Sequence, residues 1–363
     1  MAAYTTIDNP ELHFQVKIYT GDGNDNRSIT FDGDSDMQPD FLWFRNRGAS
    51  AWHNLYDSVR GANKSLASNA YNAEESRSDT LDSFDSNGFT VGNDTSQSPN
   101  GLNTNASTNT YVCWAWKAGT TGSGTTTGSG TGQSYSYSAS TTAGFSIMTY
   151  TGNGTANHTI PHHLGAVPKM FWVKIRSGDN NNWGTYHHLS NANPEQYALY
   201  LDSNSAATDD GFLNDTAPTS SVINLSSGNY GNVNTNTYVS HCWSEVQGYS
   251  KFGKYVGNGN ANGTYVYTGF RPAFVLFKGL NSNREWILAD NKRDPINEVD
   301  AVLYANTNDA EGDSDMVDFL SNGFKFIHAS GPGTINTSAE TYIYMAFAES
   351  PFVNSNGVPT NAR

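Results

Sequence analysis

Three aspartates at alternating positions are the clearest candidates for chemistry in this sequence. Asp32, Asp34 and Asp36 alternate with Gly33 and Ser35. Alternating carboxylates on a loop can supply the oxygen ligands that Ca²⁺ prefers. The EF-hand pattern also requires a glutamate further along the loop, and none stands at the right position. The sequence therefore leaves two interpretations open, a calcium site and a solvated acidic turn, and calcium is the only cofactor that it suggests.

Three tryptophans are candidates for contact with a sugar. Trp52, Trp183 and Trp286 each follow an apolar run and stand near stretches rich in Gly and Asn. Lectin-like sandwiches hold sugars with such residues, through stacking on the ring and hydrogen bonds to the amides. The alternative is that these tryptophans complete the core or a contact between modules, because an aromatic residue in a repeat usually packs.

The histidines and cysteines suggest structural roles. His162-His163 and His187-His188 are adjacent pairs, and adjacent side chains on a strand point to opposite faces, which makes them poor joint ligands for a metal. We interpret them as polar loop or interface residues. Cys113 and Cys242 lie in aromatic-rich segments, which predicts buried free thiols.

The sequence contains none of the usual catalytic motifs. Gly-x-Ser-x-Gly, His-Glu-x-x-His and the P-loop are all missing. A glycosidase needs two positioned carboxylates, but Asp and Glu are too frequent here to single out such a pair. We therefore expect a binding or structural protein and not an enzyme.

Four landmarks recur three times in the same order. They are an aromatic residue before a Gly-x-Gly turn, a proline before an apolar run, a Gly-Phe pair, and a Thr-Tyr that opens the last strand. The opening and closing tyrosines are Tyr19 and Tyr111, Tyr150 and Tyr238, and Tyr255 and Tyr342, which lie 92, 88 and 87 residues apart. Nearly constant spacing of ordered landmarks predicts three copies of one module.

The landmarks predict β structure throughout. Asn-Gly or Asp-Gly before an aromatic residue is typical of a hairpin turn, and proline is tolerated at the start of a strand. About a hundred residues of short strands in each copy favour an all-β fold of three tandem β-sandwich or jelly-roll-like modules. The expected modules are residues 1–117, 145–248 and 249–352.

The segments outside the modules have a different composition. Residues 118–144 are rich in Gly, Ser and Thr, which predicts a flexible linker. We accordingly expect module 1 to be detachable and modules 2 and 3 to form a fused pair. The polar tail 353–363 is expected to be mobile or to depend on a partner.

Charge and targeting signals narrow the choice of partners. The formal net charge is -14, whereas a phosphate backbone calls for a concentrated basic face, so we expect no nucleic-acid partner. The N-terminus has no basic stretch followed by an apolar run, which predicts no signal peptide and no membrane insertion.

Several segments resemble a repeat of virion proteins from marine bacteriophages, such as those that infect cyanobacteria. The resemblance covers module 1 closely and the other two loosely, and it rests on segments 17–21, 37–43, 57–62, 87–92 and 110–119. Its Asp-Ser-Val-Arg-Gly motif stands at 57–61, is missing from module 2 and survives in module 3 only as 290–293. The resemblance carries over no catalytic residue.

What the resemblance implies is a non-enzymatic structural protein of a virion, made in the host cytoplasm. A tail fibre or similar appendage that attaches to the host surface is the first expectation. A decoration or fibre protein on the capsid exterior and a lectin-like glycan-binding protein are the alternatives. Its expected partners are other virion proteins, a surface glycan and further copies of itself in a homo-oligomer such as a trimer.

Overall fold

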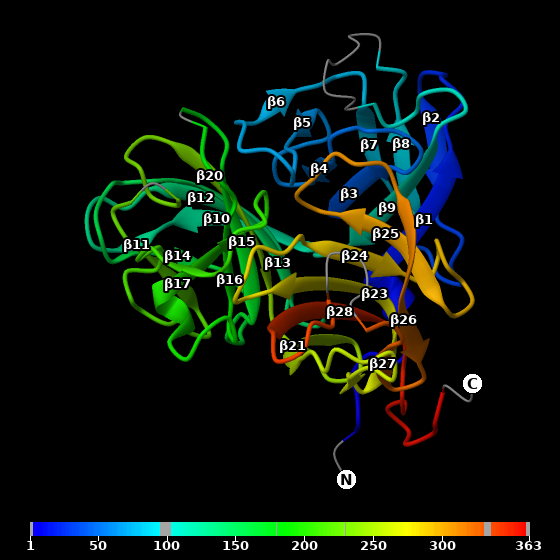
Figure 1. Ribbon diagram of the computed structural model, residues 1–363. Coiled ribbons are helices and arrows are strands. Elements are labelled where there is room, and N and C mark those ends of the chain that lie inside the picture. Colours follow the sequence, from blue (N-terminus) through cyan, green and yellow to red (C-terminus); the bar gives the residue numbers. More distant parts are fainter. Residues whose placement is uncertain (1–2, 95–102, 179, 229, 330–334, 361–363) are drawn as a thin grey trace.

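The computed structural model describes residues 3–94, 103–178, 180–228, 230–329 and 335–360 (Figure 1). The helical segments among them are two short 3₁₀ turns, Pro10–Leu12 and Pro194–Gln196. All other regular elements are strands, so the predicted all-β fold is confirmed.

The strands fall into three groups that follow the three repeats. Module 1 contains β1 (Phe14–Thr20), β2 (Arg27–Thr30), β3 (Phe41–Asn46), β4 (Asn54–Asp57), β5 (Lys64–Ser65), β6 (Glu75–Ser76), β7 (Leu81–Asp85), β8 (Gly88–Val91) and β9 (Thr110–Trp116). Module 2 contains β10 (Thr120–Thr125), β11 (Thr127–Gly128), β12 (Ser134–Ser140), β13 (Phe145–Thr151), β14 (His158–Pro161), β15 (Met170–Ile175), β16 (Gly184–His187), β17 (Tyr197–Tyr200), β18 (Thr208–Asp209), β19 (Val222–Leu225) and β20 (Thr237–Trp243). Module 3 contains β21 (Ser250–Val256), β22 (Tyr265–Tyr267), β23 (Phe270–Gly279), β24 (Ile287–Asp290), β25 (Val299–Tyr304), β26 (Gly312–Leu320), β27 (Gly323–Phe326) and β28 (Thr341–Pro351).

Each module contains four neighbouring antiparallel strands in the same order, which we call its inner sheet. The orders are β1-β9-β3-β4, β13-β20-β15-β16 and β21-β28-β23-β24. The opening and closing tyrosines of each repeat are cross-strand partners in this sheet, and their stacked rings have centroids 5.0 to 5.3 Å apart. The sequence repeat is therefore also a structural repeat.

A buried asparagine is a further landmark, which the sequence reading missed. Asn105, Asn232 and Asn336 are each fully buried and stand six residues before the closing tyrosine. Each side-chain amide donates to backbone carbonyls of the Gly-x-Gly turn or of nearby loops. Each buried amide is thereby satisfied, and it connects the segment before the closing strand to the loops around it.

One hydrophobic core joins all three modules. It gathers the inner-sheet faces and includes Trp116 of β9, Trp243 of β20 and Phe347 of β28, all at most 1% exposed. Trp116 contacts both of the others, with ring centroids 6.3 Å from Trp243 and 5.5 Å from Phe347. The remaining sheet faces cover three smaller cores, one in each module. Each module is thus a two-layered unit whose inner layer faces a common centre.

This shared core overturns the expectation of a detachable module 1 beside a fused pair. Figure 1 shows modules 1, 2 and 3 grouped side by side, in blue, green and yellow to red. Phe14 of module 1 stacks on Phe347 of module 3 at 5.2 Å, and Phe41 of module 1 lies 6.4 Å from Trp172 of module 2. Module 1 therefore packs against both of its neighbours.

The predicted flexible linker is wrong, because most of residues 118–144 form a hairpin in the sheet of module 2. Strand β10 pairs with β12, and β12 pairs with β13. Gly122 and Gly124 lie opposite Tyr137 and Tyr135, and a Cβ on either glycine would come within 2.7 Å of the tyrosine side chain. The glycines are therefore positions where an aromatic ring lies flat across the strand.

The polar tail also folds back, as far as it is described. Val353 forms a bridge with Pro359, and the backbone amide of Ser355 donates to Asp8 at 2.6 Å. The contact with Asp8 connects the C-terminal tail to the N-terminal segment.

Candidate functional site

The predicted sugar-binding tryptophans do not form a common site. Trp183 and Trp286 are 0% and 1% exposed, so neither ring can stack on a sugar from solvent. Trp52 is half-buried and borders a crevice of only about 10 Å³. The alternative interpretation is the correct one for Trp183 and Trp286, because both complete contacts between modules.

These contacts are made from equivalent positions in the three modules. The residues directly before β4, β16 and β24 are His53, Trp183 and Trp286. Trp183 Nε1 donates to Ala67 O of module 1, and Trp286 Nε1 donates to Tyr200 O of module 2, each at 2.8 Å. Module 1 reaches module 3 with His53, whose Nε2 lies 2.9 Å from Tyr304 O.

Three buried cationic side chains connect the modules in the same cyclic order, from module 1 to 3, from 2 to 1 and from 3 to 2. Arg45, Lys174 and Lys278 stand at equivalent positions on β3, β15 and β23 and are at most 1% exposed. Arg45 donates to Asp309 O of module 3, Lys174 to Tyr71 O of module 1 and Lys278 to Asn204 O of module 2. A head-to-tail contact that closes after three steps defines a ring with approximate threefold symmetry.

Burial lowers the pKa of these lysines, to about 8 for Lys174 and to about 7 for Lys278. A lysine with such a pKa is often catalytic. Here, however, each ammonium group lies against backbone carbonyls on both sides of a junction. The geometry therefore assigns both lysines to the module junctions.

Ion-pair chains reinforce two of the three junctions. In module 1, Arg60 pairs with buried Asp57 at 2.5 Å and with Glu74 at 3.1 Å, and Glu74 also binds Arg176 of module 2 at 2.9 Å. In module 3 the same chain runs through Asp290, Arg293 and Glu311 to Arg47 of module 1. The Asp-Ser-Val-Arg-Gly motif and its echo are thus parts of these junctions.

The third junction has lost these charges. His187 and Ser190 of module 2 replace Asp57 and Arg60, and the backbone amide of Ala207 bonds Leu280 O where Glu74 bonds Arg176 O. This arrangement is less polar but keeps the same backbone connection. The third junction therefore keeps the backbone hydrogen bond without the ion pairs of the motif.

Buried histidines at the junctions should make stability depend on pH. Burial lowers the pKa of His53 and His187 well below the usual value. Folding therefore excludes a proton that the unfolded chain binds below about pH 6.5, so stability is full above that pH and is lost as the pH falls. We expect the free energy of unfolding in urea to drop by about 2 kcal/mol per histidine between pH 7.5 and pH 5.0.

The double variant His53→Gln/His187→Gln keeps polar side chains but cannot titrate. Its free energy of unfolding should fall less over the same pH interval than that of the wild type. Parallel pH profiles for the two proteins would contradict the assignment.

The three alternating aspartates have different hydrogen-bond partners and do not converge on one point. Asp32 accepts hydrogen bonds from Lys17 at 3.2 Å and from Lys292 of module 3 at 3.3 Å. Asp36 accepts one from Asn87, and the backbone amide of Asp34 donates to Glu11. The described part of the chain contains no group of three or more His, Cys, Asp or Glu residues that could hold a metal ion. The geometry therefore gives the calcium interpretation no support, and Asp32 instead links two modules.

The paired histidines and the cysteines lie where the sequence suggested. His187 and His188 of module 2 bond carbonyls of module 3, at 3.3 Å and 3.0 Å. His163 stacks on Tyr137 with ring centroids 3.6 Å apart. Cys113 and Cys242 are buried free thiols, which confirms that prediction.

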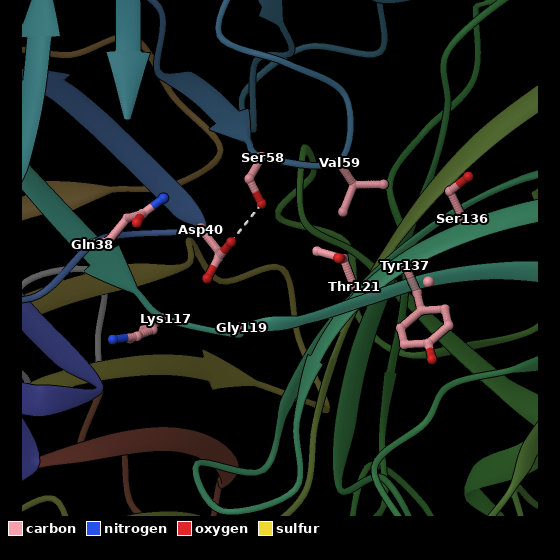
Figure 2. A pocket seen from close by; sticks show the side chains of 10 residues that line it. Gln38, Asp40, Ser58, Val59, Lys117, Gly119, Thr121, Ser136 and Tyr137 are labelled. Carbon is pink, nitrogen blue, oxygen red and sulfur yellow. Dashed lines mark hydrogen bonds between the residues drawn. The ribbon is translucent and has the colours of Figure 1, made fainter. Parts of the chain in front are cut away.

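A cavity with both polar and apolar walls is the strongest candidate for a binding site. It has a volume of about 500 Å³ and lies between module 1 and the β10–β12 hairpin (Figure 2). It is lined by Gln38, Asp40, Ser58, Val59, Lys117, Gly119, Thr121, Gly122, Ser136 and Tyr137. The ring of Tyr137 points away from Asp40 in Figure 2. The walls of the cavity combine hydroxyl, amide and charged groups with the apolar surface of residues such as Val59.

Hydrogen bonds hold the side chain of Asp40 in place in the wall of this cavity. Its Oδ1 accepts from Ser58 Oγ at 2.6 Å, and its Oδ2 accepts from the backbone amide of Ala118 at 2.9 Å. Burial raises the pKa of Asp40 above its usual range, although these hydrogen bonds oppose the shift. Asp40 is also the only carboxylate among the lining residues, whereas glycoside hydrolysis uses a pair. The cavity is suited to hold a polyhydroxylated ligand.

The sequence reading overlooked this site, although a signal was present. The residue after the landmark proline is Asp40 in module 1, Lys169 in module 2 and Ala273 in module 3. A departure from the repeat at one position can mark a role that the other copies lack. The hairpin that forms the second wall also occurs only in module 2 among the described residues.

The fold and the cavity define a closed ring of three β modules with a candidate binding site at one junction. A family model described as "Domain of unknown function (DUF7483)" matches residues 9–351, and the chain belongs to this family. No curated protein and no solved structure matches the chain. In the described residues, no helix has the length and apolar character needed to cross a membrane.

Proposed function

We propose that this chain is a non-enzymatic structural protein of a bacteriophage particle, part of a tail fibre or similar appendage that contacts the host surface. The observation that supports this proposal most is that the buried charged side chains connect the modules to one another. Two ion-pair chains and three buried cations bind one module to the next, while the cavity at Asp40 has a single carboxylate among its lining residues. Such a rigid body suits mechanical attachment better than turnover.

Location on the particle tests this proposal. Antibodies against the chain should label one end of purified virions, and quantitative mass spectrometry should count few copies per particle. A copy number that matches the capsid symmetry would instead place the chain among decoration proteins. Absence of the chain from purified particles would contradict both assignments.

We further propose that the cavity at Asp40 binds a sugar of the host surface. Its hydroxyl, amide and carboxylate groups can form the directional hydrogen bonds that orient such a ligand. Ser136 is exposed on the cavity wall, so Ser136→Trp should fill the cavity without removing a hydrogen bond. We expect this variant to lose at least about 90% of glycan-array binding, a tenfold change that corresponds to about 1.4 kcal/mol.

Ser134→Trp is the matched control, because Ser134 is exposed on the same strand but does not line this cavity. Its glycan binding should remain at the wild-type level. Equal binding by both variants would show that any sugar site lies elsewhere.

A further inference from the structure

The outer edges of the sheets differ in how they are protected against pairing with another chain. Strands β1 and β21 lie at the ends of their sheets and carry lysines, Lys17 on β1 and Lys251 and Lys254 on β21. Charged residues, and lysine above all, keep an edge strand from pairing with another chain. The equivalent strand of module 2, β13, has no charged residue and is instead covered by β12 and β10.

Strand β10 is the new edge that this hairpin creates, and it carries none of these protections. Thr120–Thr125 contains no charged residue and no proline, and all six of its residues are at least partly exposed. It pairs with β12 in an unbroken register without a bulge. In the described part of the chain no strand lies beyond β10. Thr121 and Gly122 also line the cavity at Asp40, whereas Ser123, Gly124 and Thr125 do not. The outer side of β10 therefore presents backbone donors and acceptors that can pair with another strand, beginning beside this cavity.

We propose that β10 pairs antiparallel with β10 of a second copy of this chain. The segment Thr121-Gly122-Ser123-Gly124-Thr125 reads the same in both directions. With a twofold axis through Ser123, each Ser123 faces its counterpart, each Gly122 faces a Gly124, and each Thr121 faces a Thr125. A twofold axis brings the same surface of two copies together. Here the palindrome makes every facing pair identical in type, small and uncharged, so pairing with a second copy brings no bulky or charged side chains against one another.

The side chains that would face one another across the axis also favour pairing with a second copy. Ser and Thr side chains directly opposite one another can form hydrogen bonds, and no pair of like charges faces across the axis. Pairing would also join the sheet containing β10 to its counterpart and remove an open edge from each copy. The net charge of -14 on each chain opposes association at long range, but physiological salt screens charges that are more than about 8 Å apart.

Sedimentation equilibrium over a dilution series of the full chain tests the proposal. The wild type should associate to twice the chain mass of 39.4 kDa. Ser123→Lys and Ser123→Asp should each raise the dissociation constant at least about fivefold, because like charges then face across the axis. An equimolar mixture of the two variants should recover the association, since the ammonium group introduced in one copy would face the carboxylate introduced in the other.

Thr131→Lys is the control for the added charge, because Thr131 is exposed in the loop between β11 and β12. It should keep the wild-type dissociation constant. The proposal is overturned if the wild type stays at the chain mass or assembles to three times that mass. It is also overturned if Ser123→Lys behaves like Thr131→Lys, or if the mixture of variants fails to recover the association.

Discussion

Trp243→Ala should lower the free energy of unfolding of the entire chain, not of module 2 alone, by about 3–5 kcal/mol. Trp243 is fully buried in the core that the three modules share. Its ring lies 4.6 Å from Trp172 of its own module and 6.3 Å from Trp116 of module 1. Removing the indole leaves a cavity that borders two modules, and no single sheet can close it by shifting.

Native-state hydrogen exchange distinguishes a global from a local effect. In the Trp243→Ala variant, amides of β9 in module 1 and β28 in module 3 should lose as much protection as those of β20. Tyr267→Ala removes an aromatic residue that is 53% exposed, and it should change stability by no more than about 0.5 kcal/mol. Unchanged protection of β9 and β28 in Trp243→Ala would show that the modules unfold independently.

The sequence was sufficient to predict the three modules because their landmarks report on local structure. Tyr19 and Tyr111 stand far apart in the chain, yet both are fixed by the turns and strands beside them. Their pairing in β1 and β9 then sets the register of the inner sheet. The same reasoning holds in the other copies, which is why four landmarks at nearly constant spacing led to the right fold.

The hairpin at 120–140 could not be predicted in the same way. Gly, Ser and Thr are typical of flexible linkers, and nothing local shows that Tyr135 and Tyr137 will cover Gly124 and Gly122. The strand exists because its partner strand and β13 provide a surface for it. Tertiary contacts therefore override the weak intrinsic preference of these residues for β structure.

The candidate site depended on contacts between modules, which the sequence does not encode at short range. Trp183 stands beside polar residues in the sequence, but module 1 covers it and accepts its indole hydrogen bond. Asp40 forms a cavity only because the hairpin of module 2 lies opposite. Exposure of a residue in a closed ring is decided by the neighbouring module, so spacing alone could not separate buried tryptophans from binding ones.

Arg60→Ser should destabilise the chain by about 3–5 kcal/mol, because it leaves a buried carboxylate without its charged partner. Burial raises the pKa of Asp57, but the charge of Arg60 and the hydrogen bond from His241 of module 2 outweigh it and hold that pKa below its usual value. In the wild type Asp57 therefore stabilises the fold above about pH 4, and this contribution is lost in acid. Without Arg60 the burial effect dominates, so the deficit of the variant relative to the wild type should shrink as the pH falls from about 7 to about 4.

Ser is the appropriate substitute because module 2 already carries Ser190 at this position. The double variant Asp57→Asn/Arg60→Ser removes the unpaired charge and should recover about 1–3 kcal/mol of the loss, as measured by urea unfolding. Lys251→Ser breaks the partly exposed pair with Glu245 and should cost at most about 1 kcal/mol, with no recovery in acid. If Arg60→Ser costs no more than Lys251→Ser, or if the double variant is no more stable than the single one, the ion-pair chain does not hold this junction.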